Sequence, residues 1–104
     1  MKPYVGTRTP HGVAVTVDGQ PLDPRFDLSN HSPTGFEWGY VGSGPAQLAL
    51  ALVADHLGDD EWAIACHQDF RWTVVVKLPH SWTLTSNNIE RVLQSLLGKV
   101  SRHV

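Results

Sequence analysis

The feature that most constrains the fold is an apolar stretch over residues 46–54, which only Gln47 interrupts. Pro45 fits the first turn of a helix, where a missing N–H costs nothing, and Gly58 fits a left-handed helix end. A helix with apolar side chains on almost every side has to be buried on most of them. The sequence therefore predicts a central helix over residues 45–57, around which the rest of a 104-residue chain packs.

Short strands are predicted where apolar and polar side chains alternate, since a strand with one buried face has a period of two. The predicted strands cover residues 4–8, 13–17, 20–22, 36–41, 70–78 and 82–84. The alternation is clearest at 70–78, with Phe70 and Trp72 on one side and Arg71 and Thr73 on the other. Asp18-Gly19 is typical of a hairpin turn.

Two further helices are predicted. One begins at Asp59-Asp60-Glu61 and places Trp62, Cys66 and Phe70 on one face. The other begins at Thr85 or Ser86, has apolar residues at 89, 92, 93, 96 and 97, and stops at Gly98. The element order indicates an α+β fold: a mostly antiparallel sheet of about four to five strands with three helices packed mainly on one face. We expect residues 1–98 to form one domain and residues 99–104 to form a C-terminal tail.

Composition argues against several classes of protein. The chain is 41% hydrophobic with a net charge of -2, which disfavours both a disordered chain and a general nucleic-acid binder. No apolar run has the length of a membrane span, and the first residues do not have the pattern of a secretory signal. The single cysteine, Cys66, fits a reducing cytoplasm. We leave the oligomeric state open.

The sequence contains no residue set that we assign to catalysis or to metal binding. No two of the six histidines have zinc-ligand spacing with a cysteine pair, so the sequence predicts no metal and no cofactor. Gly42-Ser43-Gly44 lies between a predicted strand and a predicted helix, as a nucleophile elbow does, but Pro45 departs from that pattern. An enzyme would need His31 within hydrogen-bond reach of Ser32, Ser43 or a carboxylate.

The turn at residues 42–45 gives one functional hypothesis. A glycine-rich turn before a helix points free N–H groups toward solvent beside the positive end of the helix dipole. An anion or nucleotide would then be surrounded by neighbouring polar residues: His31, Ser32, Ser43, Gly44 and Gln47, with positive charge from Arg25 or Arg71. The structural alternative is a capped helix whose glycines allow close packing against the sheet.

The second hypothesis is a non-catalytic protein-binding module. Residues 55–70 carry five acidic side chains and no Lys or Arg, and the chain has four tryptophans. A small inhibitor or adaptor needs only a rigid face with a few anchoring side chains. The candidate interface residues are Glu37, Trp38, Tyr40, Asp55, Asp59, Asp60 and Glu61. The alternative for these acids is that they only stabilise the start of a helix.

Three segments carry a family resemblance: residues 30–40 (NHSPTGFEWGY), 42–52 (GSGPAQLALAL) and 68–79. Over residues 22–97 the chain resembles a family of bacterial, plasmid and phage proteins, domain of unknown function 6166. The family usually has glycine where Val41 stands here. The resemblance implies a shared fold and a shared surface around residues 31–47, and no activity. The spread of the family through phages and plasmids implies an anti-defence role, such as an anti-CRISPR.

Overall fold

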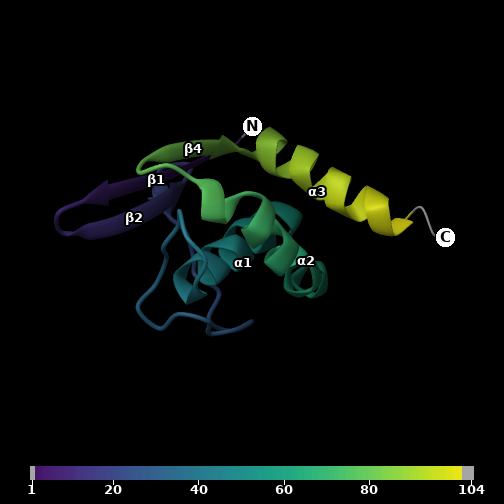
Figure 1. The fold of residues 1–104 in the computed structure, drawn as a ribbon, viewed down its shortest axis with the longest axis horizontal. Helices are drawn as coiled ribbons and strands as arrows, with labels where there is room; N and C mark the ends of the chain where they lie inside the picture. Colours follow the sequence, from purple (N-terminus) through teal and green to yellow (C-terminus); the bar gives the residue numbers. More distant parts are fainter. Residues whose placement is uncertain (1, 102–104) are drawn as a thin grey trace.

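The sheet lies on one side of the molecule, and α1 and α2 lie on the other (Figure 1). The computed structural model describes residues 2–101. In chain order the elements are β1 (Pro3–Thr9), β2 (Gly12–Val17), β3 (Gln20–Pro21), α1 (Ser43–Leu57), α2 (Asp60–Thr73), the 3-10 helix η1 (Val75–Lys77), β4 (Trp82–Thr85) and α3 (Ser86–Ser101). The strand order is β3-β2-β1-β4, and every pair is antiparallel. The predicted α+β class and antiparallel sheet are confirmed, with four strands.

One face of the sheet supplies side chains to the core. Tyr4 of β1 and Val15 of β2 are buried there, and so is Trp82 of β4, which pairs with Gly6 of β1. A Cβ atom on Gly6 would lie 2.2 Å from Cε2 of the Trp82 indole. Gly6 therefore makes the space in which a large aromatic side chain of the neighbouring strand lies flat against the sheet.

The central helix is confirmed. Every residue from Gly44 to Ala54 in α1 is buried, and Leu48 to Val53 have no exposed surface. The helix begins at Ser43, after Gly42 as N-cap, and Gly58 ends it with φ 65° in the left-handed conformation. This burial on all sides follows from the lack of a polar face.

The predicted strand at residues 70–78 is wrong. Helix α2 continues to Thr73, and η1 follows it. The buried residues Ala63, Cys66 and Phe70 are three and four apart, and this helical period extends the helix past the start of the apparent alternation. The helix ends where a run of four β-branched residues, 73–76, lowers helix propensity.

The predicted strand at residues 36–41 is also wrong, because this segment forms no strand and pairs with none. The alternating aromatic residues do not share a buried face, because Trp38 is 2% exposed whereas Tyr40 is 51% exposed. Of these two, Trp38 alone anchors this part of the segment in the core. Gly39 has φ 84°, outside the extended region, and its N–H donates to the carbonyl of Val75 in η1. The segment therefore packs on η1 as irregular chain.

The last helix, α3, follows β4 directly and buries Ile89 and Leu93, as its apolar spacing predicts. Gly98 does not stop it, because α3 continues to Ser101. The predicted tail at 99–104 is thus helical in its first part, and residues 102–104 lie outside the described residues. Among the described residues, no helix has the length and apolar character needed to span a membrane.

Candidate functional site

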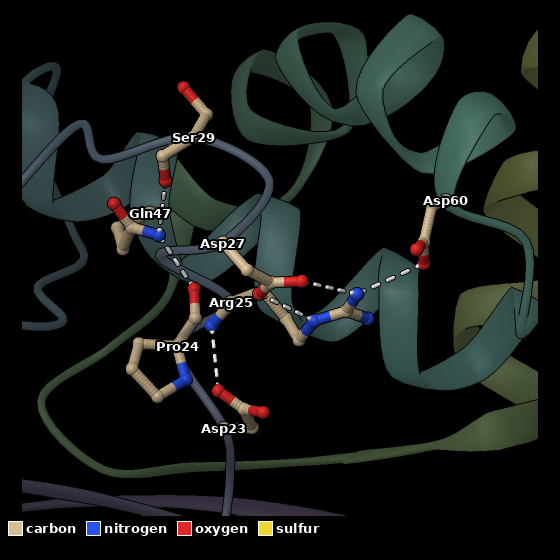
Figure 2. Close-up of polar contacts among 7 residues, drawn as sticks. All are labelled: Asp23, Pro24, Arg25, Asp27, Ser29, Gln47 and Asp60. Atoms are coloured by element: carbon tan, nitrogen blue, oxygen red, sulfur yellow. Dashed lines mark hydrogen bonds and ion pairs between the residues drawn. The ribbon is translucent and has the colours of Figure 1, made fainter.

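Gln47 holds the long loop between β3 and α1. Its side chain has no exposed surface, and its Oε1 accepts hydrogen bonds from the backbone N–H of His31 (2.7 Å) and Ser32 (3.2 Å). Its Nε2 donates to the carbonyls of Pro24 (2.6 Å) and Ser29 (3.1 Å), as Figure 2 shows. Both ends of the amide are thus occupied by the backbone. The sequence predicted Gln47 as a ligand contact, but these four bonds make it the anchor of the loop.

Arg25 ties the same loop to α2. It has φ 59°, which is uncommon for a residue other than glycine, and its N–H donates to Oδ1 of Asp23. Its guanidinium binds both carboxylate oxygens of Asp27 and, at 3.1 Å, Oδ1 of Asp60 (Figure 2). The hydrogen bonds from Arg25 lower the pKa of Asp27. The positive charge that the anion hypothesis assigned to Arg25 is therefore shared between two carboxylates.

His31 meets His67 of α2 at 3.0 Å between the two Nε2 atoms. Nδ1 of His67 lies 3.1 Å and 2.8 Å from the carbonyls of Ala63 and Ile64, so Nδ1 carries the hydrogen. Nε2 of a neutral His67 then accepts, and Nε2 of His31 donates. Burial, together with His67 and Arg71, lowers the pKa of His31. The His31 ring hydrogen-bonds to His67 and not to a hydroxyl or carboxylate. This contact therefore does not provide the His31 partner that the enzyme hypothesis requires.

The glycine turn is closed on one side. Gly44 is buried, and a Cβ atom there would lie 2.6 Å from Cβ and 3.1 Å from the backbone nitrogen of Glu37. Ser43 is exposed, whereas Ser32 is buried with its N–H on Gln47. Gly44 therefore packs closely against Glu37, as the structural alternative expects. The anion site stays a prediction, and Ser43 is the exposed side chain of the turn that could contact an anion.

Arg71 lies between α2 and this turn. Its Nη1 donates to the carbonyl of Gly42 at 3.4 Å, and its guanidinium carbon lies 5.1 Å from the ring centroid of Trp72. The structure thus brings Arg71 to the glycine turn, whereas Arg25 and His31 bind their own partners. Arg71 connects the turn with the exposed Trp72.

Three candidate interface residues lie around β1. Glu37 makes two hydrogen bonds with the Arg8 guanidinium, 2.7 Å and 3.1 Å, which lower its pKa. The guanidinium carbon of Arg8 also lies 4.7 Å from the ring centroid of Trp38, which is buried against Trp82. Trp38 is therefore a core residue and not an exposed anchor. Tyr40 is exposed, as an interface residue has to be.

The acidic candidates have different surroundings. Asp55 at the end of α1 accepts from Tyr4 (2.7 Å) and Lys2 (3.3 Å), and burial next to this carboxylate raises the pKa of Tyr4. Asp60 binds Arg25. Asp59 caps α2, since its Oδ1 accepts from the N–H of Trp62. Glu61 is exposed in the first turn. Helix-end chemistry therefore accounts for Asp59, while the charges of Asp55 and Asp60 are paired.

Sequence reasoning missed the exposed face of α2. Trp62 was expected on the buried face with Cys66 and Phe70, but Trp62 is 51% exposed. Trp72, assigned to a strand, is equally exposed. We call five exposed residues of α2 the α2 outer face: Glu61, Trp62, Ala65, Asp69 and Trp72. The last four follow one another at intervals of three, four and three residues, and Glu61 directly precedes Trp62. Once 70–73 is read as helix, this spacing predicts a single exposed face.

Two clefts border these elements. One, of about 200 Å³, is lined by Leu22, Asp23, Arg25, Ala51 and Asp55. The other, of about 350 Å³, is lined by Asp59, Glu61, Trp62 and Ala65 at the N-terminal end of the α2 outer face. Among the described residues, no three His, Cys, Asp or Glu side chains gather as metal ligands would. The larger cleft therefore combines carboxylates with an exposed indole.

The chain belongs to the family of unknown function DUF6166, whose family model matches residues 4–95. The match includes the N-terminal hairpin, which lies before the segments that carried the resemblance in the sequence. No curated protein and no solved structure matches the chain. Membership therefore establishes the family and leaves the activity to be argued from the site.

Proposed function

We propose that the chain is a small non-catalytic protein-binding module that docks its partner on the α2 outer face. The observation that carries this proposal is that Trp62 and Trp72 are each 51% exposed on one face of a helix. The opposite face of the same helix buries Ala63 and Phe70 completely. The exposed tryptophans are thus side chains that the chain's own core leaves uncovered.

The energetic gain from covering these side chains is substantial. A tryptophan buries roughly 150–250 Å², so about 100 Å² of each half-exposed ring is open to a partner. At about 25 cal/mol per Å², each ring contributes up to ~2.5 kcal/mol on burial. Tryptophan is also among the residue types enriched at the energetic centres of protein interfaces. Two such residues on one rigid helix are what an inhibitor or adaptor needs.

The role we propose is that of an inhibitor or adaptor in the cytoplasm, where the single Cys66 stays reduced. The family resemblance supports a more specific form, an anti-defence protein that blocks a host system. The identity of the captured partner separates this form from a general adaptor.

The alternatives have less support. An anion at the glycine turn would find Gly44 covered by Glu37, which leaves Ser43 as the exposed polar side chain there. A catalytic His31 would have to act through Nδ1, because its Nε2 is hydrogen-bonded to His67, and among the described residues no hydroxyl or carboxylate hydrogen-bonds to the His31 ring. We therefore place the docking surface on α2 rather than at the turn.

The test is affinity capture from a lysate of the source organism with wild-type protein and with a Trp62→Ala, Trp72→Ala double variant. We expect wild type to retain one stoichiometric partner that the double variant loses. Ile64→Ala is the matched control, because Ile64 is similarly exposed on α2 but follows Trp62 by two residues, about 200° around the helix axis. Equal capture by wild type and the double variant would refute the proposal.

A further inference from the structure

Three acidic side chains near Trp62 make no ion pair within the described part of the chain, whereas at the other end of the face the Arg71 guanidinium carbon lies 5.1 Å from the ring centroid of Trp72. Lys2 pairs with Asp55, and Arg25 pairs with Asp60. Among the described residues, no ion pair involves Asp59, Glu61 or Asp69. All three side chains are exposed, and they border Trp62 and Ala65. The α2 outer face is therefore apolar and acidic at once.

The cleft of about 350 Å³ lies where these features meet. Its lining residues are Asp59, Glu61, Trp62 and Ala65. A guanidinium or ammonium group on the face of an indole gains a cation–π interaction, and nearby carboxylates add charge-assisted hydrogen bonds. The small side chain of Ala65 keeps the depression open beside the ring. The cleft thus has the chemistry to accept a Lys or Arg side chain.

The spacing along the helix sets the length of the partner segment. Trp62 and Trp72 are ten residues apart, which corresponds to about 15 Å along a helix axis. A partner helix of about three turns covers both rings, with a cationic side chain at the Trp62 end and apolar side chains near Trp72. A second copy of this chain fits less well, because its α2 outer face would bring a second set of acidic side chains, Glu61 and Asp69, to a face that is already acidic.

We propose that the α2 outer face binds a basic amphipathic helix of the partner and seats one of its Lys or Arg side chains between Asp59, Glu61 and Trp62. This inference rests on the proposed function and specifies the chemistry of the partner. Complementary charge and a three-turn apolar stripe define the class of protein segment that the face recognises.

The test uses two model peptides of about 15 residues, long enough to form a helix. One has leucine and alanine on one side and arginine on the other, and the second has glutamate in place of arginine. Calorimetric titration into wild-type protein is expected to show binding of the arginine peptide alone. A triple variant, Asp59→Asn, Glu61→Gln and Asp69→Asn, is expected to bind it roughly tenfold more weakly. Asn at position 59 keeps the oxygen that caps α2.

The control is Asp18→Asn, which removes one charge from the β2–β3 turn and is expected to leave the affinity unchanged. Equal binding of both peptides, or unchanged affinity in the triple variant, would overturn the inference. If neither peptide binds while lysate capture still depends on Trp62 and Trp72, the basic-helix chemistry is wrong and the proposed function stands. If sedimentation shows a dimer that Trp72→Glu dissociates, a second copy occupies the face and the inference is again overturned.

Discussion

The sharpest prediction concerns Gln47, whose amide makes four hydrogen bonds to the backbone of one loop. Gln47→Met keeps the length of the side chain and its burial in α1 but removes every one of these bonds. The N–H groups of His31 and Ser32 then lose their acceptor, and the carbonyls of Pro24 and Ser29 lose their donor. The loop therefore either keeps unpaired buried groups or moves toward water.

The expected cost follows from these two outcomes. A hydrogen bond contributes about 1 kcal/mol net, so the four together contribute about 4 kcal/mol. Opening the loop lets water replace part of the loss, and we expect a destabilisation of about 2–4 kcal/mol. With a urea slope of about 1.5 kcal/mol per M, the unfolding midpoint falls by roughly 1.3–2.7 M.

Urea unfolding measures the loss, and hydrogen exchange of the His31 and Ser32 amides locates it. Gln68→Met is the matched control, because Gln68 is also a helical glutamine, but its Oε1 has no hydrogen-bond partner in the described structure. We expect the control to change stability by less than about 0.5 kcal/mol. If Gln47→Met is as mild as the control, or if the two amides exchange at the wild-type rate, the assignment of Gln47 as the loop anchor is refuted.

Three further predictions concern stability. The pKa of His31 lies below its ordinary value of 6.5, so between these two pKa values the unfolded chain binds more protons than the folded chain. The contribution of His31 to stability is therefore fully present above pH 6.5 and is lost as the pH falls through the lowered pKa. When the pH is lowered from 7.5 to 5, the urea midpoint is expected to fall less in His31→Asn than in wild type. Gly44→Ala should cost about 1–3 kcal/mol, since its Cβ would press on the Cβ and the backbone nitrogen of Glu37, and a wild-type melting temperature would contradict this packing. Gly6→Ala should displace the Trp82 ring and shift its fluorescence to the red; an unchanged spectrum would contradict the close contact.

The fold was predictable where one pattern had no competitor. The central helix has an apolar run and a terminal glycine, and the hairpin has Asp18-Gly19 between alternating strands. The segment at 70–78 satisfies two periods at once, because Phe70 continues the helical spacing of Ala63 and Cys66 and also begins an alternation. Tertiary packing on α1 decided between them, and no local pattern contains that information.

The candidate site was predicted less well because its contacts join distant residues. His31 and His67 are 36 positions apart, and Arg25 and Asp60 are 35 apart. Sequence identified Gln47 as unusual because it is the one polar residue in an apolar run, which is a real signal. That signal is shared by a ligand contact and a buried anchor, and the loop that wraps over Gln47 determines which of the two it is.

The contacts of α2 explain why its outer face is suited to binding. One side packs in the core through Ala63 and Phe70, and the flank opposite Trp62 is held by the loop at Asp60 and His67. A helix fixed in this way loses little conformational freedom when a partner covers its remaining side. Under the proposed function, the polar residues first identified as ligand contacts would therefore support binding indirectly, by holding α2 in place. Substitutions at Gln47 should lower stability and binding together, whereas substitutions at Trp62 should lower binding alone. This difference distinguishes residues that hold α2 in place from residues that contact the partner.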